Sequence, residues 1–540
     1  MSIQPQSRNH ASNRSVGQWL GLSGYVLVVL GPLLVLAGIT VQALLDGNAE
    51  WLHLAIPAGR RTKLLLNSLR LALAVSGSAM FLGWVGAVAL WRWQSRLTVP
   101  LVWFILPLVA LPPYVQALAW LTLSSFLRNL MQPLGLSVVA PYGWTGTLWV
   151  EVATFAPLAL GFCWLGLRSI DPELIEAGRV VHSDFRCLIR IALPLSAPAL
   201  LTGGGILFLI SFLDYGVPSL LQFNVYAMEI LAEFSISNSP ERAFLLTLPL
   251  FAIAVGVLVC LLEPLRALTL RQVLFRPIWT SPPRWPKWLV GLQWVVCGML
   301  IIQALLPVFT LAFLSNNPKQ LASAVIQAHA KVGFSLWTAA LAALLSLPIA
   351  FAAAQVLVRA GNAGRLVWFL VITPLAMPAS LVGIGLIALS NRPFLQGRFV
   401  INLMPALASV ARFAPLAALV ILAQLRRTDR LLFDAALVFQ PAWWRRQLQI
   451  TAPLLAPGLL AGGGIVFAFS MGELGATLMV APPGQATLTM RIYNYLHYGA
   501  SDVVAGLCLV LAAGVLIAGG VAAIGGALWS RFFDYPEGKS

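Results

Sequence analysis

The sequence predicts an all-α integral membrane protein with about twelve transmembrane helices, arranged as two parallel six-helix repeats. Three observations carry this prediction. Only 10% of the 540 residues are charged while 59% are apolar, whereas soluble domains carry about 25% charged residues. Apolar runs of about 20 residues, long enough to cross a bilayer as a helix, recur along the whole chain. One stretch of the first half also recurs in the second half.

Each apolar run is continuous rather than alternating, which favours helices over barrel strands. The expected spans lie near 19–45, 65–91, 98–124, 145–167, 195–221, 244–264, 289–314, 334–358, 366–389, 403–425, 454–480 and 502–527. The first run is too long for a signal-peptide core, so we expect it to be retained as a span. Residues 1–18 and 528–540 are expected to be polar tails.

The distribution of Lys and Arg predicts the orientation. Basic residues are frequent in the loops on the side of the N-terminal tail and fewer in the opposite loops. Because positively charged loops stay in the cytoplasm, both termini are expected there. The net charge of +16 then reflects orientation in a lipid bilayer, and we expect no nucleic-acid partner.

An internal repeat relates the two halves of the chain. "PLSAPALLTGGGILFLISFLDYG" (194–216) aligns with "PLLAPGLLAGGGIVFAFSMGELG" (453–475) at an offset of 259, with 13 of 23 positions identical. Upstream, "TFAPLAL" (154–160) and "LRSID" (167–171) align with "RFAPLAA" and "LRRTD" at an offset of 258. One residue is therefore missing from the first copy, between the two matched regions.

The repeat divides the chain into two domains, 65–262 and 333–525, each preceded by one lead span, 19–45 or 289–314. Six spans per half is an even number, so both copies face the same way and a pathway can lie between them. The basic, Pro-rich segment 265–288 joins the halves. Because its prolines cannot continue a helix, we expect a cytoplasmic linker.

A polar segment follows the fourth span of each half: "DPELIEAGRVVHSDFRCLIRIALP" (171–194) and "DRLLFDAALVFQPAWWRRQLQITAP" (429–453). Asp171 and Asp429 are good helix N-caps, and Pro172 suits a first helical position. We expect each segment to form a short helix, a break and an amphipathic stretch that ends in proline.

A membrane-surface helix anchored by its tryptophans would account for one such segment. A passive anchor does not, however, require the same segment at the same place in both halves. The repetition is better explained if each segment is a helix that inserts aromatic and basic residues into a groove on a soluble partner.

The two segments resemble the EAA loop of ABC-importer permeases, which has the pattern E-A-A, three residues, Gly, nine residues and I-x-L-P. In that family the loop forms a coupling helix that docks on the ATP-hydrolysing subunit. The resemblance covers roughly 65–262 and 333–525. We call 171–194 the first EAA segment and 429–453 the second EAA segment.

The resemblance implies two sets of coupling residues. They are Glu176, Ala177, Gly178, Phe185 and Pro194 in the first half, and Asp434, Ala435, Ala436, Trp443, Trp444 and Pro453 in the second. The pattern's glycine is replaced by Gln440 in the second half and is missing near His182 in the first. Pro441 offers a helix break in the second half, and the first half shows no substitute.

A fused double permease of this length resembles the importers of ferric iron, thiamine and aminophosphonate. The stretch 472–499 most resembles the ferric-iron and aminophosphonate permeases. The resemblance implies a permease subunit in the bacterial inner membrane, without a cofactor, that works with two ATP-binding subunits and a periplasmic binding protein. Ferric iron or a similar small solute is the expected cargo, while thiamine, aminophosphonate and polyamine stay open.

Two acidic residues, Asp214 and Glu473, occupy the same repeat position in or at the outer end of the fifth span. Ionisable residues at membrane depth are costly and usually functional, so both are candidate pathway residues that would favour a cationic cargo. Equally, both could lie at the outer interface and meet water. Two further charges, Glu151 and Arg412, lie in the fourth spans at non-equivalent positions; they could pair with one another or each reach towards the interface.

No catalytic residues, metal cluster or ATPase is expected in the chain itself. The glycine triplets 203–205 and 462–464 lie inside spans, where close helix packing explains them better than phosphate binding. The five cysteines show no metal-ligand spacing. The terminal "GKS" lacks the earlier glycine of a phosphate loop.

A secondary transporter of the major-facilitator type is the alternative, because it too has twelve spans in two parallel halves. Such a transporter carries a charged Gly-Asp-Arg-type motif between its second and third spans, where this chain has only "WRWQSRLTVP". It also gives no reason for the two EAA segments.

Overall fold

The computed structural model describes residues 20–93, 112–134, 141–270, 282–314, 318–359, 364–392, 398–440, 442–497 and 501–533. All regular elements in these ranges are helical, as the sequence predicts. The N-terminal tail, the first part of the expected third span and Pro441 lie outside the described residues. Within the described part, eight helices are long and apolar enough to span a membrane, or up to eleven if each of three bent pairs is one span. The prediction of a many-span helical protein is confirmed, and twelve spans remain a prediction.

Two of the expected spans, 19–45 and 366–389, are bent rather than straight, and each bend adjoins a proline. Leu20–Val29 meets α2 (Gly31–Leu45) at 64°, beside Pro32. The helix that ends at Ala376 meets α16 (Ala379–Ser390) at 98°, and Pro378 caps the second member. Because proline has no backbone N–H and its ring clashes with the preceding turn, a helix breaks or kinks there.

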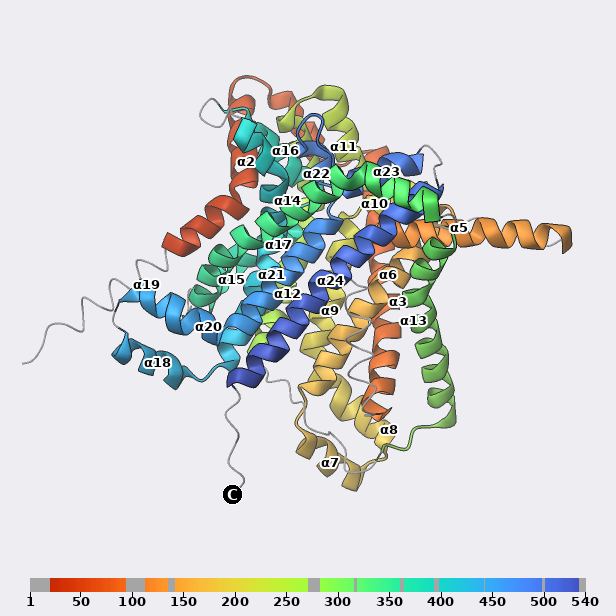
Figure 1. Cartoon of the computed structure of the whole chain (residues 1–540), viewed down its shortest axis with the longest axis vertical. Coiled ribbons are helices and arrows are strands. Elements are labelled where there is room, and N and C mark those ends of the chain that lie inside the picture. Colours follow the sequence, from red (N-terminus) through yellow and green to blue (C-terminus); the bar gives the residue numbers. More distant parts are fainter. Residues whose placement is uncertain are drawn as a thin grey trace, which may run out of the picture. The chain divides into compact units, whose positions relative to one another are not determined.

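The described chain forms two compact units. The first-half unit comprises 42–330 and 488–513. Its long helices α3, α6 and α9 lie side by side in Figure 1, and α7 and α8 lie at one end of them. Its helices are η1 (Ala49–Ala55), α3 (Arg60–Trp93), α5 (Pro113–Met131), η3 (Gln132–Leu134), α6 (Gly143–Arg168), α7 (Pro172–Val181), α8 (Asp184–Cys187), η4 (Leu188–Ala192), α9 (Leu193–Leu213), α10 (Gly216–Leu220), α11 (Tyr226–Ser237), α12 (Pro240–Leu270), α13 (Lys287–Leu314) and α23 (Leu488–His497).

The second-half unit comprises 1–41, 331–487 and 514–540. Helices α17 and α21 of this unit pack against each other. Its helices are α15 (Gly364–Ile372), η5 (Thr373–Ala376), α16, α17 (Arg398–Arg427), α18 (Arg430–Phe439), α19 (Trp443–Arg446), η7 (Gln447–Thr451), α20 (Ala452–Leu454), α21 (Ala456–Gly472) and α22 (Thr477–Val480). Helices α2, α14 (Pro318–Arg359) and α24 (Ser501–Phe533) contribute residues to both units.

Each unit takes its lead helix from the other half of the sequence. In the second-half unit, the hydroxyl of Tyr25 donates a hydrogen bond of 2.8 Å to the carbonyl of Val371. In the first-half unit, Trp93 packs on Trp294 of α13, with ring centroids 4.9 Å apart. The spans expected to precede each domain therefore pack against the opposite repeat, an exchange that sequence order does not reveal.

Close helix contacts explain the glycine triplets. A Cβ on Gly203 would lie 2.7 Å from Phe162 of α6, and one on Gly205 would lie 2.4 Å from Leu261 of α12. In the second half, Gly462 faces Ala417 of α17. Both triplets thus serve helix packing within a bilayer, as small residues commonly do.

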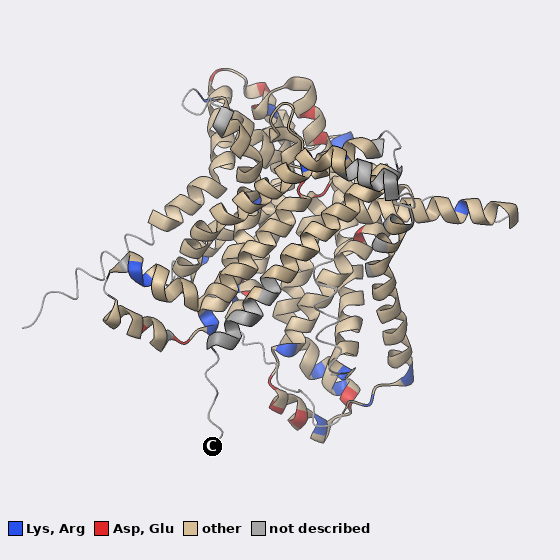
Figure 2. Cartoon of the chain, in the orientation of Figure 1, with Lys and Arg blue, Asp and Glu red and all other residues tan. Residues whose placement is uncertain are grey.

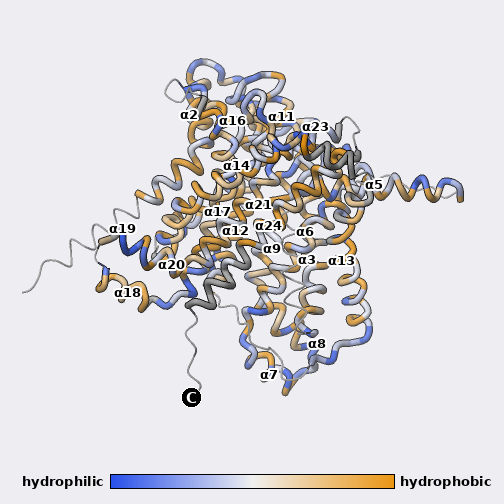
Figure 3. The backbone as a smooth tube through the Cα atoms, in the orientation of Figure 1, coloured by the Kyte–Doolittle hydropathy of each residue, from blue (hydrophilic) through white to orange (hydrophobic). Residues whose placement is uncertain are grey.

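The hydropathy of the first-half unit follows a membrane pattern. Hydrophobic colouring runs along the long helices, and hydrophilic residues concentrate at their ends, including the region of α7 and α8 (Figure 3). Both basic and acidic residues gather at that end, while the middle of α3 and α13 is almost free of charge (Figure 2).

Candidate functional site

The first EAA segment forms two short helices joined by a sharp turn. The side chain of Asp171 accepts a hydrogen bond of 3.0 Å from the backbone N–H of Glu173, and Pro172 occupies the first turn of α7. The chain is extended at His182 and Ser183, and α8 then leads into α9. The predicted N-cap, short helix, break and Pro-containing re-entry are confirmed here.

The second EAA segment repeats this arrangement. Asp429 caps α18 by accepting a 2.9 Å hydrogen bond from the backbone N–H of Leu431. Gln440 ends α18 in a non-helical conformation, and α19 begins at Trp443. Beyond this point the halves differ, because α20 and α21 meet at a bend of 80° whereas Asp184–Leu213 is one continuous span.

Each segment re-enters the bundle through one π-helical turn. The two turns, η4 and η7, occupy positions related by the repeat offset of 259 (188 to 447, and 192 to 451). Single π turns inside helices are rare and are often found at functional sites. Their recurrence shows that the repeat preserves an irregular backbone feature as well as a sequence pattern.

A small residue at the third position of the E-A-A pattern lets the short helix approach this π turn. A Cβ on Gly178 would lie 2.4 Å from Ile191 and 3.4 Å from Cys187. Ala436 takes the equivalent place in the second half and is buried, whereas Ala177 and Ala435 are exposed. One small residue therefore packs against the protein, and its neighbour faces outward.

An arginine side chain bridges the turn in each half. In the first half the Arg179 side chain donates a 2.9 Å hydrogen bond to the carboxylate of Asp184. In the second half Arg446 donates a 3.1 Å hydrogen bond to the backbone carbonyl of Gln440. Sequence reasoning did not single out Arg179 or Asp184; opposite charges on the two sides of the expected break were the available signal.

Exposed apolar side chains end the short helix in both halves. Val180 and Val181 on α7, and Val438 and Phe439 on α18, are between 77% and 86% exposed. They occupy the same two repeat positions, at an offset of 258. Trp444 is also exposed, and Asp434 lies on the exposed surface of α18. Isolated exposed apolar residues need no explanation, but here the same exposed pair recurs at both sites.

The remaining predicted coupling residues support these helices. Glu176 lies 3.5 Å from Arg179 in an ion pair, and Phe185 is half-buried on α8. Pro194 and Pro453 lie in the first turns of α9 and α20.

In each unit, polar side chains join two long helices near the end opposite the EAA segment. The helices are α6 and α9 in the first-half unit and α17 and α21 in the second-half unit, and we call these contacts the polar layer. In the first-half unit the hydroxyl of Ser211 on α9 donates to the carboxyl of Glu151 on α6, which is fully buried. The other Glu151 oxygen has no hydrogen-bond partner among the described residues. Both carboxylate oxygens of Asp214 accept backbone N–H groups, from Gly216 and Val217 at 3.1 Å each.

The second-half unit builds its layer from the equivalent four positions with different residues. The hydroxyl of Ser470 donates to that of Ser409 at 2.8 Å. Arg412 forms an ion pair with the buried carboxylate of Glu473, which also accepts the backbone N–H of Ala476 at 2.7 Å. The partner of Arg412 is thus Glu473 in its own unit. These contacts place Asp214 and Glu473 where the chain leaves the fifth span, and their pathway role remains a prediction.

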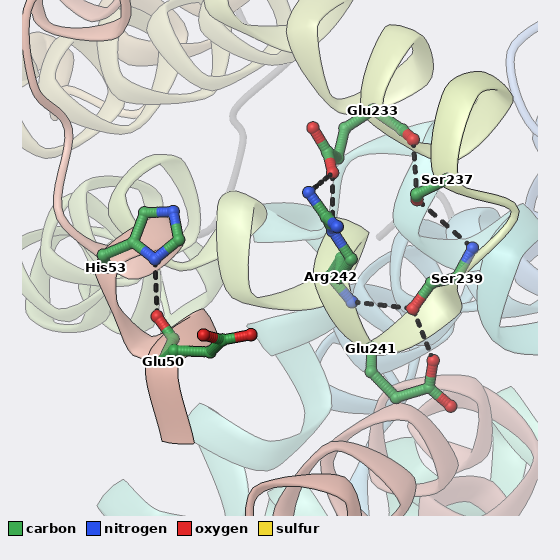
Figure 4. Close-up of polar contacts among 7 residues, drawn as sticks. All are labelled: Glu50, His53, Glu233, Ser237, Ser239, Glu241 and Arg242. Atoms are coloured by element: carbon green, nitrogen blue, oxygen red, sulfur yellow. Dashed lines mark hydrogen bonds and ion pairs between the residues drawn. The ribbon is translucent and has the colours of Figure 1, made fainter. Parts of the chain in front are cut away.

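The first-half unit also has a group of charged side chains on α11 and α12, at the end of the unit opposite α7 and α8 (Figure 1). We call this group the charged corner. Arg242 on α12 donates to Glu233 on α11 at 2.8 Å, and the Ser239 hydroxyl donates to Glu241 (Figure 4). Nearby, the His53 ring is hydrogen-bonded to the backbone carbonyl of Glu50 in η1. The corner is polar and lies beyond the apolar stretches of the helices.

Comparisons with known proteins place these features in a family. Residues 76–267 match the family described as binding-protein-dependent transport system inner membrane component. A putrescine transport system permease protein of Escherichia coli is 30% identical over 35% of this chain and 70% of its own length. A molybdenum transport system permease protein of Haemophilus influenzae is 30% identical over 33% of this chain and 84% of its own length.

The chain belongs to this family of ABC-importer permeases. A provisionally named 2-aminoethylphosphonate transport system permease protein of Salmonella typhimurium is also similar, with 31% identity over 27% of this chain and 54% of its own length. The predicted resemblance is confirmed, and the permease is a multi-pass membrane protein. The secondary-transporter alternative is not favoured.

Proposed function

We propose that this permease forms the translocation pathway of an importer and that its two EAA segments each dock one ATP-binding subunit. The observation that carries the proposal is the repeated pair of exposed apolar residues, Val180–Val181 and Val438–Phe439. An apolar side chain at the end of a capped helix can enter a groove on a partner. Two surfaces that carry the same exposed apolar pair fit two copies of the same subunit.

Closure of the two ATP-binding subunits would move both EAA segments and switch the units between inward-open and outward-open states. Such a switch needs different contacts in the two states. The short helices α7 and α18 each pack against the protein through one small residue, so each can move as a rigid body. The basic loops argue that the EAA segments and both termini face the cytoplasm. A periplasmic binding protein would then deliver cargo at the end that carries α11 and the charged corner.

Ferric iron is the cargo we propose, with other small solutes as the alternatives. The likeness of 472–499 to ferric-iron and aminophosphonate permeases supports it. The candidate pathway carboxylates lend it no further weight, since Asp214 and Glu473 have partners in their own units. The names of the relatives cover putrescine, 2-aminoethylphosphonate and molybdenum, which differ in charge.

Docking is tested by co-purification of the permease with its ATP-binding subunit. Val181→Asp combined with Phe439→Asp places a charge in each apolar pair, and we expect the amount of bound ATP-binding subunit to fall on the order of tenfold or more. Ile236→Asp is the matched control, because Ile236 on α11 is 85% exposed at the other end of the first-half unit. Undiminished co-purification of the double variant would contradict the proposal.

Cargo is tested by uptake into cells that express the whole importer. We expect ferric iron to accumulate and unlabelled putrescine, thiamine, 2-aminoethylphosphonate and molybdate not to compete. Uptake of one of these solutes, supplied in labelled form, without iron uptake would replace iron as the cargo and leave the docking proposal unchanged.

A further inference from the structure

The end of the linker between the two halves packs onto the first EAA segment. We call residues 282–288 the strap; it runs directly into α13. Trp285 of the strap is buried in a core cluster that also contains Ile175 of α7 and Leu188 of the π turn. The linker was expected only to join the halves, yet its last residues form part of the core beneath the first EAA segment.

One carboxylate ties three elements together at this junction. Oδ1 of Asp184 accepts the hydrogen bond from Arg179 of α7, and Oδ2 accepts one from the backbone N–H of Arg284 in the strap. Asp184 itself begins α8. Because the acceptor is ionised, both bonds are of the stronger, charge-assisted kind.

An aromatic contact adds to this attachment. The ring of Phe185 meets that of Trp288 edge to face, with centroids 5.6 Å apart. Edge-to-face pairs are favourable beyond the apolar area that they bury. The strap is therefore held by a buried indole, a carboxylate and an aromatic pair, all within seven residues.

The second EAA segment has different residues at the two positions equivalent to Asp184 and Phe185. Trp443 and Trp444 replace Asp184 and Phe185 at the repeat offset of 259. The Trp444 ring is exposed, with the guanidinium of Arg445 5.1 Å from its centroid. An exposed indole with a cation beside it resembles a binding residue more than a packing residue.

We propose that the strap, held by Asp184 and Phe185, positions the first EAA segment, and that the two EAA segments are therefore not equivalent. The first segment is pre-organised by the chain's own linker and is mechanically joined to α13. The second segment keeps its aromatic residue for the ATP-binding subunit. Asp184 is a positioning residue here. The consequence for coupling rests on the proposed docking function, but the attachment itself does not.

Cys187 provides a native probe of the attachment. It is the last residue of α8 within the first segment and is buried there, with its thiol 3.8 Å from the carbonyl of His182. The test uses the full-length permease with Cys163, Cys260, Cys297 and Cys508 replaced by alanine, and measures how fast a maleimide modifies Cys187. Asp184→Ala and Trp288→Ala should each accelerate labelling on the order of tenfold, because losing either attachment favours local opening by a comparable factor.

Matched variants separate positioning from general damage. Asp184→Asn keeps the shape and one acceptor oxygen, so its labelling rate should fall between those of wild type and Asp184→Ala. Trp444→Ala in the second segment should leave Cys187 labelling unchanged. Trp288 is 61% exposed, so its replacement by alanine leaves the core intact and keeps the test decisive.

The outcomes are distinguishable from those of the docking test. Faster labelling in both Asp184→Ala and Trp288→Ala, with Trp444→Ala unchanged, supports the proposal even if no ATP-binding subunit co-purifies. Unchanged labelling in Asp184→Ala and Trp288→Ala overturns it, even if docking at Val181 and Phe439 is demonstrated. Equal acceleration by Trp444→Ala would also overturn it, because the effect would then not belong to the strap.

Discussion

The polar layers of the two units occupy the same four repeat positions and solve the same problem with different chemistry. In the first-half unit a buried Glu151 is bonded to Ser211, and Asp214 holds backbone N–H groups. In the second-half unit a pair of serines replaces the first contact, and an Arg412–Glu473 ion pair replaces the second. Because the two halves are copies of one repeat, the difference shows that the four positions keep polar residues while the charge at each position can change.

The largest effect is expected from breaking the ion pair. Arg412→Ala leaves the carboxylate of Glu473 buried without its guanidinium, and removing one member of a buried pair costs about 3–5 kcal/mol. Because the Arg412 side chain is 27% exposed, we expect the lower end, about 3 kcal/mol. Thermal unfolding of the purified permease in detergent measures the loss.

The first-half equivalent supplies the control for this substitution. Thr154→Ala removes only a hydroxyl bonded to the carbonyl of Val150 in its own helix, so its unfolding temperature should change little. Adding Glu473→Gln to Arg412→Ala should recover part of the lost stability. A large effect of Thr154→Ala, or none of Arg412→Ala, would remove the contrast between the layers.

A smaller effect is expected where the same helix pair meets closely in both halves, because the glycine that permits the contact lies on α6 in the first half and on α21 in the second. Gly166 faces Ala199 in the first half, whereas Gln424 faces Gly458 in the second. A Cβ on Gly458 would lie 2.6 Å from the Cβ of Gln424. Gly458→Ala should therefore destabilise the second-half unit by about 1–3 kcal/mol through overpacking.

Recreating the first-half arrangement sharpens that result. Gln424→Gly added to Gly458→Ala should restore most of the stability, because the close approach then has room again. Gly24→Ala is the neutral control, since nothing lies within 4 Å of its Cβ position. If the double variant is no better than Gly458→Ala alone, the exchange is not compensatory.

The smallest effect is expected at Glu151. A buried carboxylate without a neighbouring cation is costly, so an amide of the same shape should serve as well. Glu151→Gln should change the free energy of unfolding by less than about 1 kcal/mol. A loss comparable to that of Arg412→Ala would show that the carboxyl has a role that its described contacts do not explain.

Patterns local in sequence predicted much of this molecule. The caps at Asp171 and Asp429, the Pro-containing re-entry of both segments and the packing role of the glycine triplets follow from rules that need only neighbouring residues. The exchange of lead helices was not predictable in this way, because apolar spans such as α13 carry no mark of which repeat they will pack against. The strap and the polar layers likewise depend on contacts between residues distant in sequence, such as Asp184 and Arg284.

The EAA segments show the same limit. Their motif predicts which residues lie on the short helices, but not which face outward. Ala177 and Ala435 are exposed while Gly178 and Ala436 pack inward, and this split depends on the π turns that the motif does not encode. The arginines that bridge the turns also differ, since Arg179 bonds to the Asp184 carboxylate and Arg446 to the Gln440 carbonyl.

Cross-linking between the permease and its ATP-binding subunit tests the central claim most directly. Cysteines introduced at Val181 and at Phe439, in separate full-length variants without other accessible cysteines, are each treated with a short bifunctional reagent in membranes that contain the whole importer. Both variants should cross-link to the ATP-binding subunit, and Ile236→Cys should not. Absence of cross-linking at both positions, or cross-linking at Ile236→Cys alone, would contradict the claim.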